Sequence, residues 1–255
     1  MRAQAEEATK PLWYAVAAIV LVLTGYIVYS TFVKGPIQKQ EMKTQVMRQA
    51  KSLLNQGRYS DALIEFESLY KNDPTDQEIY IYYATLKLQL EKDTLLPKKL
   101  YNELIEDSNV ELKKLANTGL GLAHLVDNEL GLAEYRFREA LELDKSWSPA
   151  LVNLGLKQML SGDMEASLQS FDSALSVSPG DSLIMLHLVR ANVELAKSSG
   201  ATGSHARQAK LIINALQKRR SIFYQESMLF RIYLQLMENN PEAASKTIIQ
   251  FLDAN

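Results

Sequence analysis

The sequence predicts an all-α fold, in which a transmembrane helix precedes a stack of helical hairpins. Three observations predict this fold class. Residues 12–33 carry no charged side chain, the chain has only 11 Gly and 7 Pro, and similar residues recur at intervals of 34 positions. Long periodic segments between few helix breakers are typical of α-helices.

The N-terminal part is predicted to be a short tail, residues 1–11, and a transmembrane helix over residues 12–33. A helix of that length extends about 33 Å, enough for a hydrocarbon core of about 30 Å. Trp13 and Tyr29 lie near opposite ends of the run, as expected at the two membrane interfaces. A buried core helix and a cleaved signal peptide are the alternatives. The length of the run and its ending in Thr-Phe-Val-Lys-Gly-Pro favour an uncleaved anchor that holds the protein in a lipid bilayer.

Residues 34–42 are predicted to form a juxtamembrane linker between the anchor and the rest of the chain. Two basic residues precede the apolar run, whereas five follow it closely: Lys34, Lys39, Lys43, Arg48 and Lys51. The positive-inside tendency then predicts a single-pass protein of the inner (cytoplasmic) membrane with its large domain in the cytoplasm. The periplasmic side is the alternative, because an N-terminal anchor with a short basic tail often acts as an uncleaved export signal.

The composition excludes several classes of function. The net charge is −2 and the pI about 6.0, which does not indicate nucleic-acid binding. The chain has no cysteine, which excludes disulfides, thiol nucleophiles and cysteine-based metal sites.

An internal repeat organises the remaining sequence. Three pairs of residues are each 34 positions apart: Gly121 and Gly155, Phe137 and Phe171, Ala140 and Ala174. Pro74 and Pro179 are 105 positions apart, which is three periods plus three residues. One short insertion near Glu91 to Pro97 accounts for the difference.

These residues resemble the tetratricopeptide repeat (TPR), a helix–turn–helix unit of 34 residues that stacks into a superhelix. The resemblance covers residues 43–253 and implies a TPR-like α-solenoid of about five to six hairpins. The expected units are 43–76, 77–113, 114–147, 148–181, 182–220 and 221–253. The match is strongest in 114–147 and 148–181.

Close helix packing explains the repeated residues. Gly121 and Gly155 lack a side chain where the first helix of a unit meets the second, and Phe137 and Phe171 fill the layer between helices. A bulky residue at such a glycine is expected to cost roughly 1–3 kcal/mol. Pro74 and Pro179 are expected to close units. Asp181 is expected to cap the following helix.

Residues 197–204, Lys-Ser-Ser-Gly-Ala-Thr-Gly-Ser, are small and polar, and predict a long loop inside the fifth unit. A domain boundary at this loop is the alternative. Helical patterning resumes directly afterwards, which favours the loop.

No set of residues predicts catalysis, so we expect a protein that is not an enzyme and needs no cofactor. His124, His187 and His205 are far apart in the sequence. None has the neighbours that a metal site requires, so no metal site is predicted.

The resemblance implies that first helices line a concave groove for a peptide or a helix of a protein partner. The expected groove residues are Ile81, Thr85, Thr118, Leu122, Val152, Asn153, Leu156, Leu186 and Arg190. Family members that grip a C-terminal carboxylate use Lys, Asn and Arg. Asn153 and Arg190 could serve in this way, but Thr118 stands where a basic residue would be needed, which argues against such a clamp. Most of the groove residues are apolar, so a hydrophobic or helical ligand is favoured. The alternative is that several of these residues pack against each other.

The sequence thus predicts a membrane-anchored TPR scaffold that binds a protein partner and helps to assemble a membrane complex for secretion, pilus formation, motility or envelope maintenance. A periplasm-facing, chaperone-like adaptor for exported proteins is the alternative.

Overall fold

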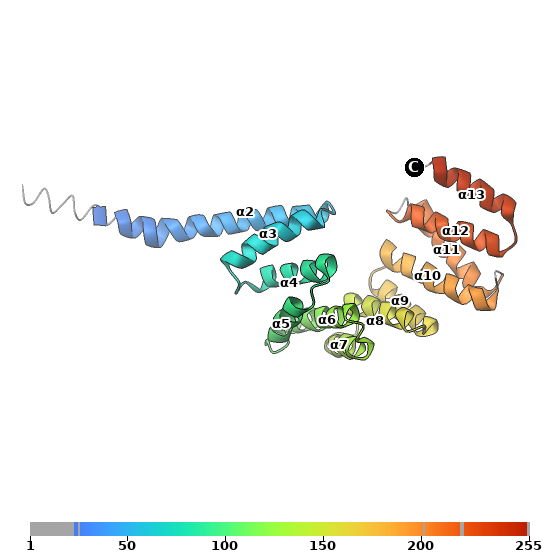
Figure 1. The fold of residues 1–255 in the computed structure, drawn as a ribbon, viewed down its shortest axis with the longest axis horizontal. Coiled ribbons are helices and arrows are strands. Elements are labelled where there is room, and N and C mark those ends of the chain that lie inside the picture. Colours follow the sequence, from blue (N-terminus) through green and yellow to red (C-terminus); the bar gives the residue numbers. More distant parts are fainter. Residues whose placement is uncertain (1–22, 25, 201, 220–221, 254–255) are drawn as a thin grey trace, which may run out of the picture. The chain divides into compact units, whose positions relative to one another are not determined.

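The computed structural model describes residues 23–24, 26–200, 202–219 and 222–253, and every regular element among them is helical (Figure 1). The chain divides into two compact units at Leu86 and Lys87. The first unit contains the π-helix η1 (Ser30–Lys34), α2 (Gly35–Asn55), α3 (Tyr59–Asn72) and α4 (Gln77–Leu86). The second contains the π-helix η2 (Lys87–Glu91), α5 (Leu95–Leu104), α6 (Val110–Val126), α7 (Leu130–Leu143), α8 (Ser148–Leu160), α9 (Met164–Val177), α10 (Ser182–Ser199), α11 (Ser204–Lys218), α12 (Tyr224–Met237) and α13 (Pro241–Asp253).

The helices pack as successive hairpins, as the repeat predicts. Contacts join α2 with α3, α6 with α7, α8 with α9, α10 with α11, and α12 with α13. Each second helix also contacts the next first helix within the second unit, and first helices contact each other in the pairs α6–α8 and α10–α12. The predicted TPR-like solenoid of helical hairpins is confirmed. The unit boundary falls inside the second predicted repeat, so the predicted domain of residues 43–253 is divided between two units.

A residue with left-handed backbone ends the first helix of most hairpins. Gly57, Asn128, Gly162 and Asn239 have φ between 55° and 81° and form the middle of a three-residue turn. Glycine and asparagine are the residues that most readily adopt this conformation at a helix end. These four turn residues also give a common register for comparing the hairpins.

Glycine and phenylalanine meet inside the central hairpins, as the sequence predicts. A Cβ added to Gly121 would lie 2.3 Å from Cε1 of Phe137, and a Cβ added to Gly155 would lie 2.7 Å from Cε1 of Phe171. Both rings are completely buried. Each glycine lies seven positions before its turn residue and each phenylalanine nine positions after it. The absent side chain is therefore what allows the ring to lie between the two helices.

The predicted start of the fifth unit is also confirmed. Oδ1 of Asp181 accepts hydrogen bonds from the backbone N–H groups of Leu183 and Ile184, at 2.8 and 3.2 Å. This contact satisfies two of the free N–H groups at the start of α10.

The loop predicted at residues 197–204 is shorter in the structure. α10 continues to Ser199, and α11 begins at Ser204. The hydroxyls of Ser198 and Ser199 donate to the carbonyl of Leu195, at 3.0 and 2.9 Å, so these polar residues are compatible with the last helical turn. The alternative of a domain boundary here is wrong, because residues 87–255 form one unit.

The insertion predicted near Glu91 to Pro97 falls mainly in the first helix of the second repeat. α4 and α5 begin 18 positions apart, at Gln77 and Leu95, whereas α8 and α9 begin 16 positions apart. η2 directly follows α4 in the sequence and takes up the extra residues as a π-helix. η2 has no Gly or Pro that would mark an insertion, whereas Pro97 follows shortly afterwards, which explains why the sequence analysis placed the insertion too late.

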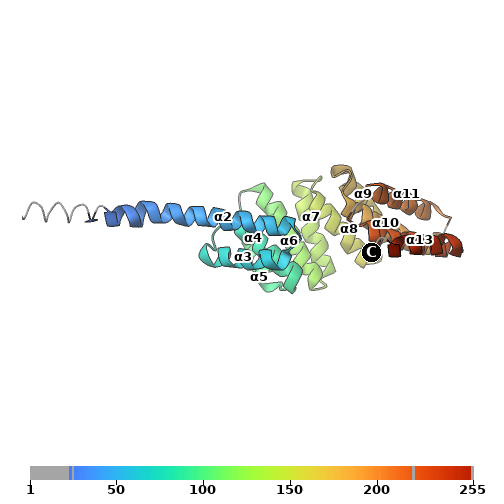
Figure 2. The same ribbon diagram turned by 90° about the horizontal axis from the view of Figure 1, so that it is seen from above.

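The predicted membrane anchor lies largely outside the described residues, which omit residues 12–22 and 25 of the 12–33 span. In the part of the chain that is described, no helix has both the length and the apolar character needed to cross a bilayer. The predicted linker of residues 34–42 is helical, and α2 passes through residue 43 without a break. Figure 2 shows α2 continuing well beyond the end of α3.

A π-helix accommodates the proline at the start of α2. Pro36 has no N–H group, and its ring would crowd the preceding helical turn. In η1 the N–H of Gly35 donates to the carbonyl of Ser30, five residues earlier, which widens the helix at this point. The helix therefore continues from Tyr26 to Asn55 through Gly35 and Pro36.

Candidate functional site

The predicted groove residues lie on first helices, and the two units divide them. Ile81 and Thr85 belong to α4 of the first unit. The others lie on consecutive first helices of the second unit: Thr118 and Leu122 on α6, Val152, Asn153 and Leu156 on α8, and Leu186 and Arg190 on α10. Because α6 contacts α8, the structure brings the residues on these two helices to neighbouring positions.

The apolar residues of this set are only partly available to a partner. Leu122 packs against the buried cluster of Ala133, Phe137 and Leu154. Val152 and Leu156 pack against the next cluster, which contains Leu151, Phe171 and Ile184. Packing within the fold therefore uses part of each of these side chains.

Thr118 is enclosed by its own neighbours. Its side chain is 6% exposed, its hydroxyl donates to the Lys114 carbonyl at 2.8 Å, and it accepts from Nε1 of Trp147 at 3.0 Å. Nδ2 of Asn153 donates to the Pro149 carbonyl at 2.8 Å, whereas Arg190 is exposed. Of the three polar residues of the predicted groove on α6, α8 and α10, Arg190 is thus the most accessible to a partner.

An exposed apolar row on α12 was missed by the sequence analysis. Leu229, Tyr233 and Leu236 are 53%, 39% and 55% exposed. They lie ten, six and three positions before the turn residue Asn239. The same three offsets from Gly162 give Val152, Leu156 and Met159. The α12 row therefore continues the predicted groove register into the last hairpin, and its side chains are more exposed there.

The signal for the α12 row was present but hidden by a change of period. Gly162 and Asn239 are 77 positions apart, which is two periods plus nine residues. The long α10 and its loop take up these residues. The last hairpin has neither the glycine nor the phenylalanine that marks the register in the central hairpins. The equivalent positions on α12 are therefore found only by counting back from the turn residue Asn239. Across from the row, Nζ of Lys197 on α10 lies 5.8 Å from the ring centre of Tyr233.

Two matching ion pairs close hairpins rather than form a binding site. Nζ of Lys43 lies 2.7 Å from Asp73, and Nζ of Lys114 lies 3.0 Å from Asp144, each pair being 30 positions apart in the sequence. Hydrogen bonds from Lys43 and the Thr75 hydroxyl lower the pKa of Asp73 to about 2. Those from Ser146 and Lys114 lower the pKa of Asp144 to about 2. The spacing of thirty residues was visible in the sequence.

Each histidine makes a local contact within the fold. His187 stacks on the buried Phe171 ring with centres 5.2 Å apart, and burial lowers its pKa, with a smaller contribution from Arg190. Nδ1 of His124 lies 2.5 Å from Glu129, and Nδ1 of His205 lies 3.2 Å from Asn192. Within the described ranges no three or more His, Asp or Glu side chains gather where they could hold a metal ion.

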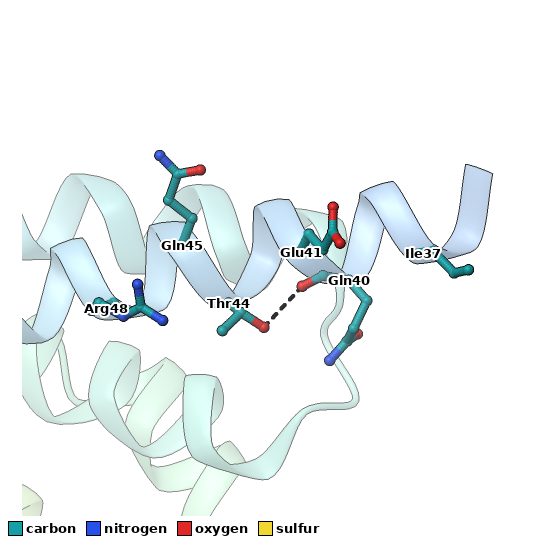
Figure 3. A pocket seen from close by; sticks show the side chains of 6 residues that line it. All are labelled: Ile37, Gln40, Glu41, Thr44, Gln45 and Arg48. Carbon is teal, nitrogen blue, oxygen red and sulfur yellow. Dashed lines mark hydrogen bonds between the residues drawn. The ribbon is translucent and has the colours of Figure 1, made fainter. Parts of the chain in front are cut away.

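Hollows of the first unit lie along α2 and between α2 and α3. The first is an open hollow along α2, lined by Ile37, Gln40, Glu41, Thr44, Gln45 and Arg48. Figure 3 shows these side chains spread along one helix, with the Thr44 hydroxyl donating to the Gln40 carbonyl at 2.9 Å. The second hollow, of about 390 Å³, lies between α2 and α3 and is lined in part by Met42, Val46 and Leu69. Neither hollow includes a residue of the predicted groove.

Known structures share the fold of this chain at low sequence identity. The TPR protein TTC0263 from Thermus thermophilus matches with a TM-score of 0.61 and 17% identity, over 76% of this chain and 98% of that one. The type IV pilus biogenesis factor PilW matches with a TM-score of 0.62 and 17% identity, over 84% and 93%.

A chain of the APC/C hetero-tetramer Cut9–Hcn1 matches with a TM-score of 0.61 and 15% identity over 81% of this chain, which spans 38% of the length of that one. No family model matches the sequence, and no curated protein is significantly similar to it. The likeness therefore identifies a tetratricopeptide repeat fold.

Proposed function

We propose that this protein is a non-enzymatic scaffold that binds a protein partner along its first helices. The observation that carries the proposal is the exposed row of Leu229, Tyr233 and Leu236 on α12. Spacings of four and three residues are those with which one helix face meets an amphipathic helix or an apolar segment. The row lies beside α10, which carries the predicted groove residues Leu186 and Arg190.

The non-enzymatic role is supported by what the polar side chains do. Lys114 and Asp144 pair with each other, His124 contacts Glu129, and Thr118 is closed off by Trp147. These groups serve contacts between and within hairpins.

We further propose that residues 12–33 anchor the scaffold in a membrane. Support comes from the described end of that segment, where Tyr26, Ile27, Val28 and Tyr29 are each between 48% and 64% exposed. Four consecutive residues of a helix point to all its sides, so this segment is apolar around its whole circumference. Such a surface is suited to a lipid environment.

The role in the cell follows from the anchor and the α12 row together. An anchored scaffold raises the local concentration of its partner at the membrane. We propose that it helps to assemble a membrane complex for secretion, pilus formation, motility or envelope maintenance; PilW, one of the proteins with this fold, is a pilus biogenesis factor. The inner membrane with the hairpins in the cytoplasm is the favoured arrangement. A periplasm-facing, chaperone-like adaptor is the second candidate, favoured by the short basic tail before the apolar run.

Photo-crosslinking in intact membranes tests the partner surface. Probes at Leu229 and Leu236 should capture one defined protein. A probe at Leu132 serves as the matched control, because this leucine is 50% exposed but lies on the second helix α7. Capture from Leu132 alone would refute the proposed surface.

Two further measurements test the anchor and its orientation. The full chain should stay in the membrane fraction after carbonate washing, and its release would disprove the anchor. A compartment-specific reporter fused to the C-terminus then distinguishes the cytoplasmic scaffold from the periplasmic adaptor.

A further inference from the structure

Arg231 on α12 stands where the central hairpins have a buried leucine. It lies eight positions before the turn residue Asn239, as Leu120 does before Asn128 and Leu154 before Gly162. Those leucines are 1% and 6% exposed. A guanidinium in such a position loses hydration, and this burial lowers the pKa of Arg231. A buried cation normally has an anionic partner.

The structure gives Arg231 only part of the partners that it needs. Its Nη2 donates to Oδ1 of Asn214 on α11. Its Nε is buried and has no hydrogen-bond partner. Among the described residues, no carboxylate forms an ion pair with Arg231. Among the described side chains, the hydrogen-bond partner of its guanidinium is thus a neutral amide.

Gln235, one helical turn further along α12, has the matching deficiency. Its Oε1 is buried and without a partner. In the central hairpin the equivalent Gln158 is hydrogen-bonded to Oγ of Ser170 at 2.7 Å. The equivalent of Ser170 is Thr247, whose hydroxyl instead donates to the Ala243 carbonyl at 3.0 Å. In the last hairpin, Nε of Arg231 and Oε1 of Gln235 therefore both lack a hydrogen-bond partner. In the central hairpin, the side-chain amide of Gln158 has one.

Both side chains border a hollow of about 200 Å³ formed by α11, α12 and α13, which we call the Arg231 hollow. Its rim also carries Lys210 and Glu238, which pair with each other. This pair cancels its own charge, so the guanidinium charge of Arg231 stays uncompensated. Residues two positions apart point to nearly opposite sides of a helix, so the Arg231 hollow lies away from the α12 row that contains Tyr233.

We propose that the Arg231 hollow binds one carboxylate group. A carboxylate oxygen would accept from the guanidinium of Arg231 and supply the missing negative charge. Rotation of the terminal amide of Gln235 would turn its NH₂ group into the hollow as a second donor. The carboxylate comes either from an Asp or Glu side chain of a protein or from a small free acid. The proposal does not depend on the membrane anchor or on the α12 row.

The experiment follows the side-chain amide signals of Asn214 and Gln235 by NMR, in the full ¹⁵N-labelled chain in detergent micelles. Sodium acetate should shift them in a saturable way, whereas sodium chloride at equal ionic strength should not. Arg231→Leu should weaken acetate binding roughly tenfold or more, because a hydrogen bond to a charged group is lost. Arg207→Leu is the matched control, since Arg207 is exposed on α11 and does not line the Arg231 hollow, and it should leave the titration unchanged.

A second measurement excludes a purely structural role for Arg231. Arg231→Leu restores the residue of the central hairpins, so the melting temperature should rise by about 2–4 °C. A fall in the melting temperature would show that Arg231 serves the fold and would overturn the proposal. Absence of a saturable acetate shift, or a shift that Arg231→Leu leaves intact, would also overturn it.

The source of the carboxylate is identified by a further titration. Glutamate blocked at both its amino and α-carboxyl groups presents only the side-chain carboxylate of a protein. Tighter binding of blocked glutamate than of acetate would assign the hollow to an acidic side chain. The reverse order would assign it to a small free acid.

Discussion

The central hairpins, α6–α7 and α8–α9, differ from the last hairpin, α12–α13, at the same register positions. The central ones place Gly121 against Phe137 and Gly155 against Phe171. The last hairpin has Ile232 and Ile248 at the corresponding positions. The central rings are fully buried, whereas Ile248 is 40% exposed.

In the central hairpins, close helix packing requires glycine and phenylalanine at these positions. In the last hairpin the packing permits other residues. A further first helix follows α7 and α9 and contacts them. In α12, Arg231 stands in place of a buried leucine, and the apolar row in the groove register is more exposed than its equivalents on α8. Both candidate binding surfaces therefore lie where the last hairpin differs from the central ones.

The largest expected effect comes from emptying the central core. Phe137→Ala should lower the free energy of unfolding by about 3–5 kcal/mol, because the fully buried ring leaves a cavity. The register equivalent Ile248→Ala should cost only about 1 kcal/mol, since that side chain is partly in water. Urea unfolding of both variants measures the contrast, and equal losses would show that the last hairpin is packed like the central ones.

A smaller effect should follow from filling the glycine position. Gly121→Ala places a Cβ 2.3 Å from the Phe137 ring and should cost about 1–3 kcal/mol. Gly131→Ala is the control, because nothing lies within 4 Å of its added Cβ and α7 gains a better helix former. Thermal unfolding should show opposite signs for the two variants; destabilisation by both would argue against the close approach.

The hydrogen bonds of Ser146 and Lys114 to Asp144 predict a pH dependence in the central hairpins. The pKa of Asp144 is about 2 in the folded protein and about 3.9 in an unfolded chain. These contacts therefore stabilise the fold fully above about pH 4, and this stabilisation is lost as the pH falls towards 2. Asp144→Asn should melt below the wild type at neutral pH and converge with it near pH 2. A constant difference across this range would contradict the assignment.

The smallest effect on stability is expected on the α12 row. Leu236 is 55% exposed, so Leu236→Ser should change the free energy of unfolding by less than about 0.5 kcal/mol. The same change should reduce capture of the crosslinked partner by the probe at Leu229. Stability lost together with capture would mean that Leu236 serves the fold rather than a partner.

The regular part of the fold could be predicted from the sequence because it rests on local rules. The 34-residue period, the glycine–phenylalanine pairs and the helix cap at Asp181 each depend on residues inside one or two hairpins. The structure bears these out. The expected groove on α6 and α8 followed from the same register, but the register alone does not say how much of Leu122 or Val152 neighbouring side chains cover.

The irregular part could not be predicted for a related reason. The register of α12 depends on the length of α10, and the sequence suggested a loop where α10 continues to Ser199. Without that register, the sequence does not show that Arg231 takes the position of a buried leucine, and it resembles any other charged residue on a helix. The boundary between Leu86 and Lys87 leaves no mark in composition, because it lies in an apolar helical segment.

The unbroken helix from Tyr26 to Asn55 has a mechanical consequence. A straight rod of 21 residues, the length of α2 alone, is about 31 Å long. Helical hydrogen bonding connects its apolar end with the packed end beside α3, because the π-helix at Ser30–Lys34 accommodates Pro36. We therefore expect a tilt of the apolar end to be transmitted along α2 towards α3.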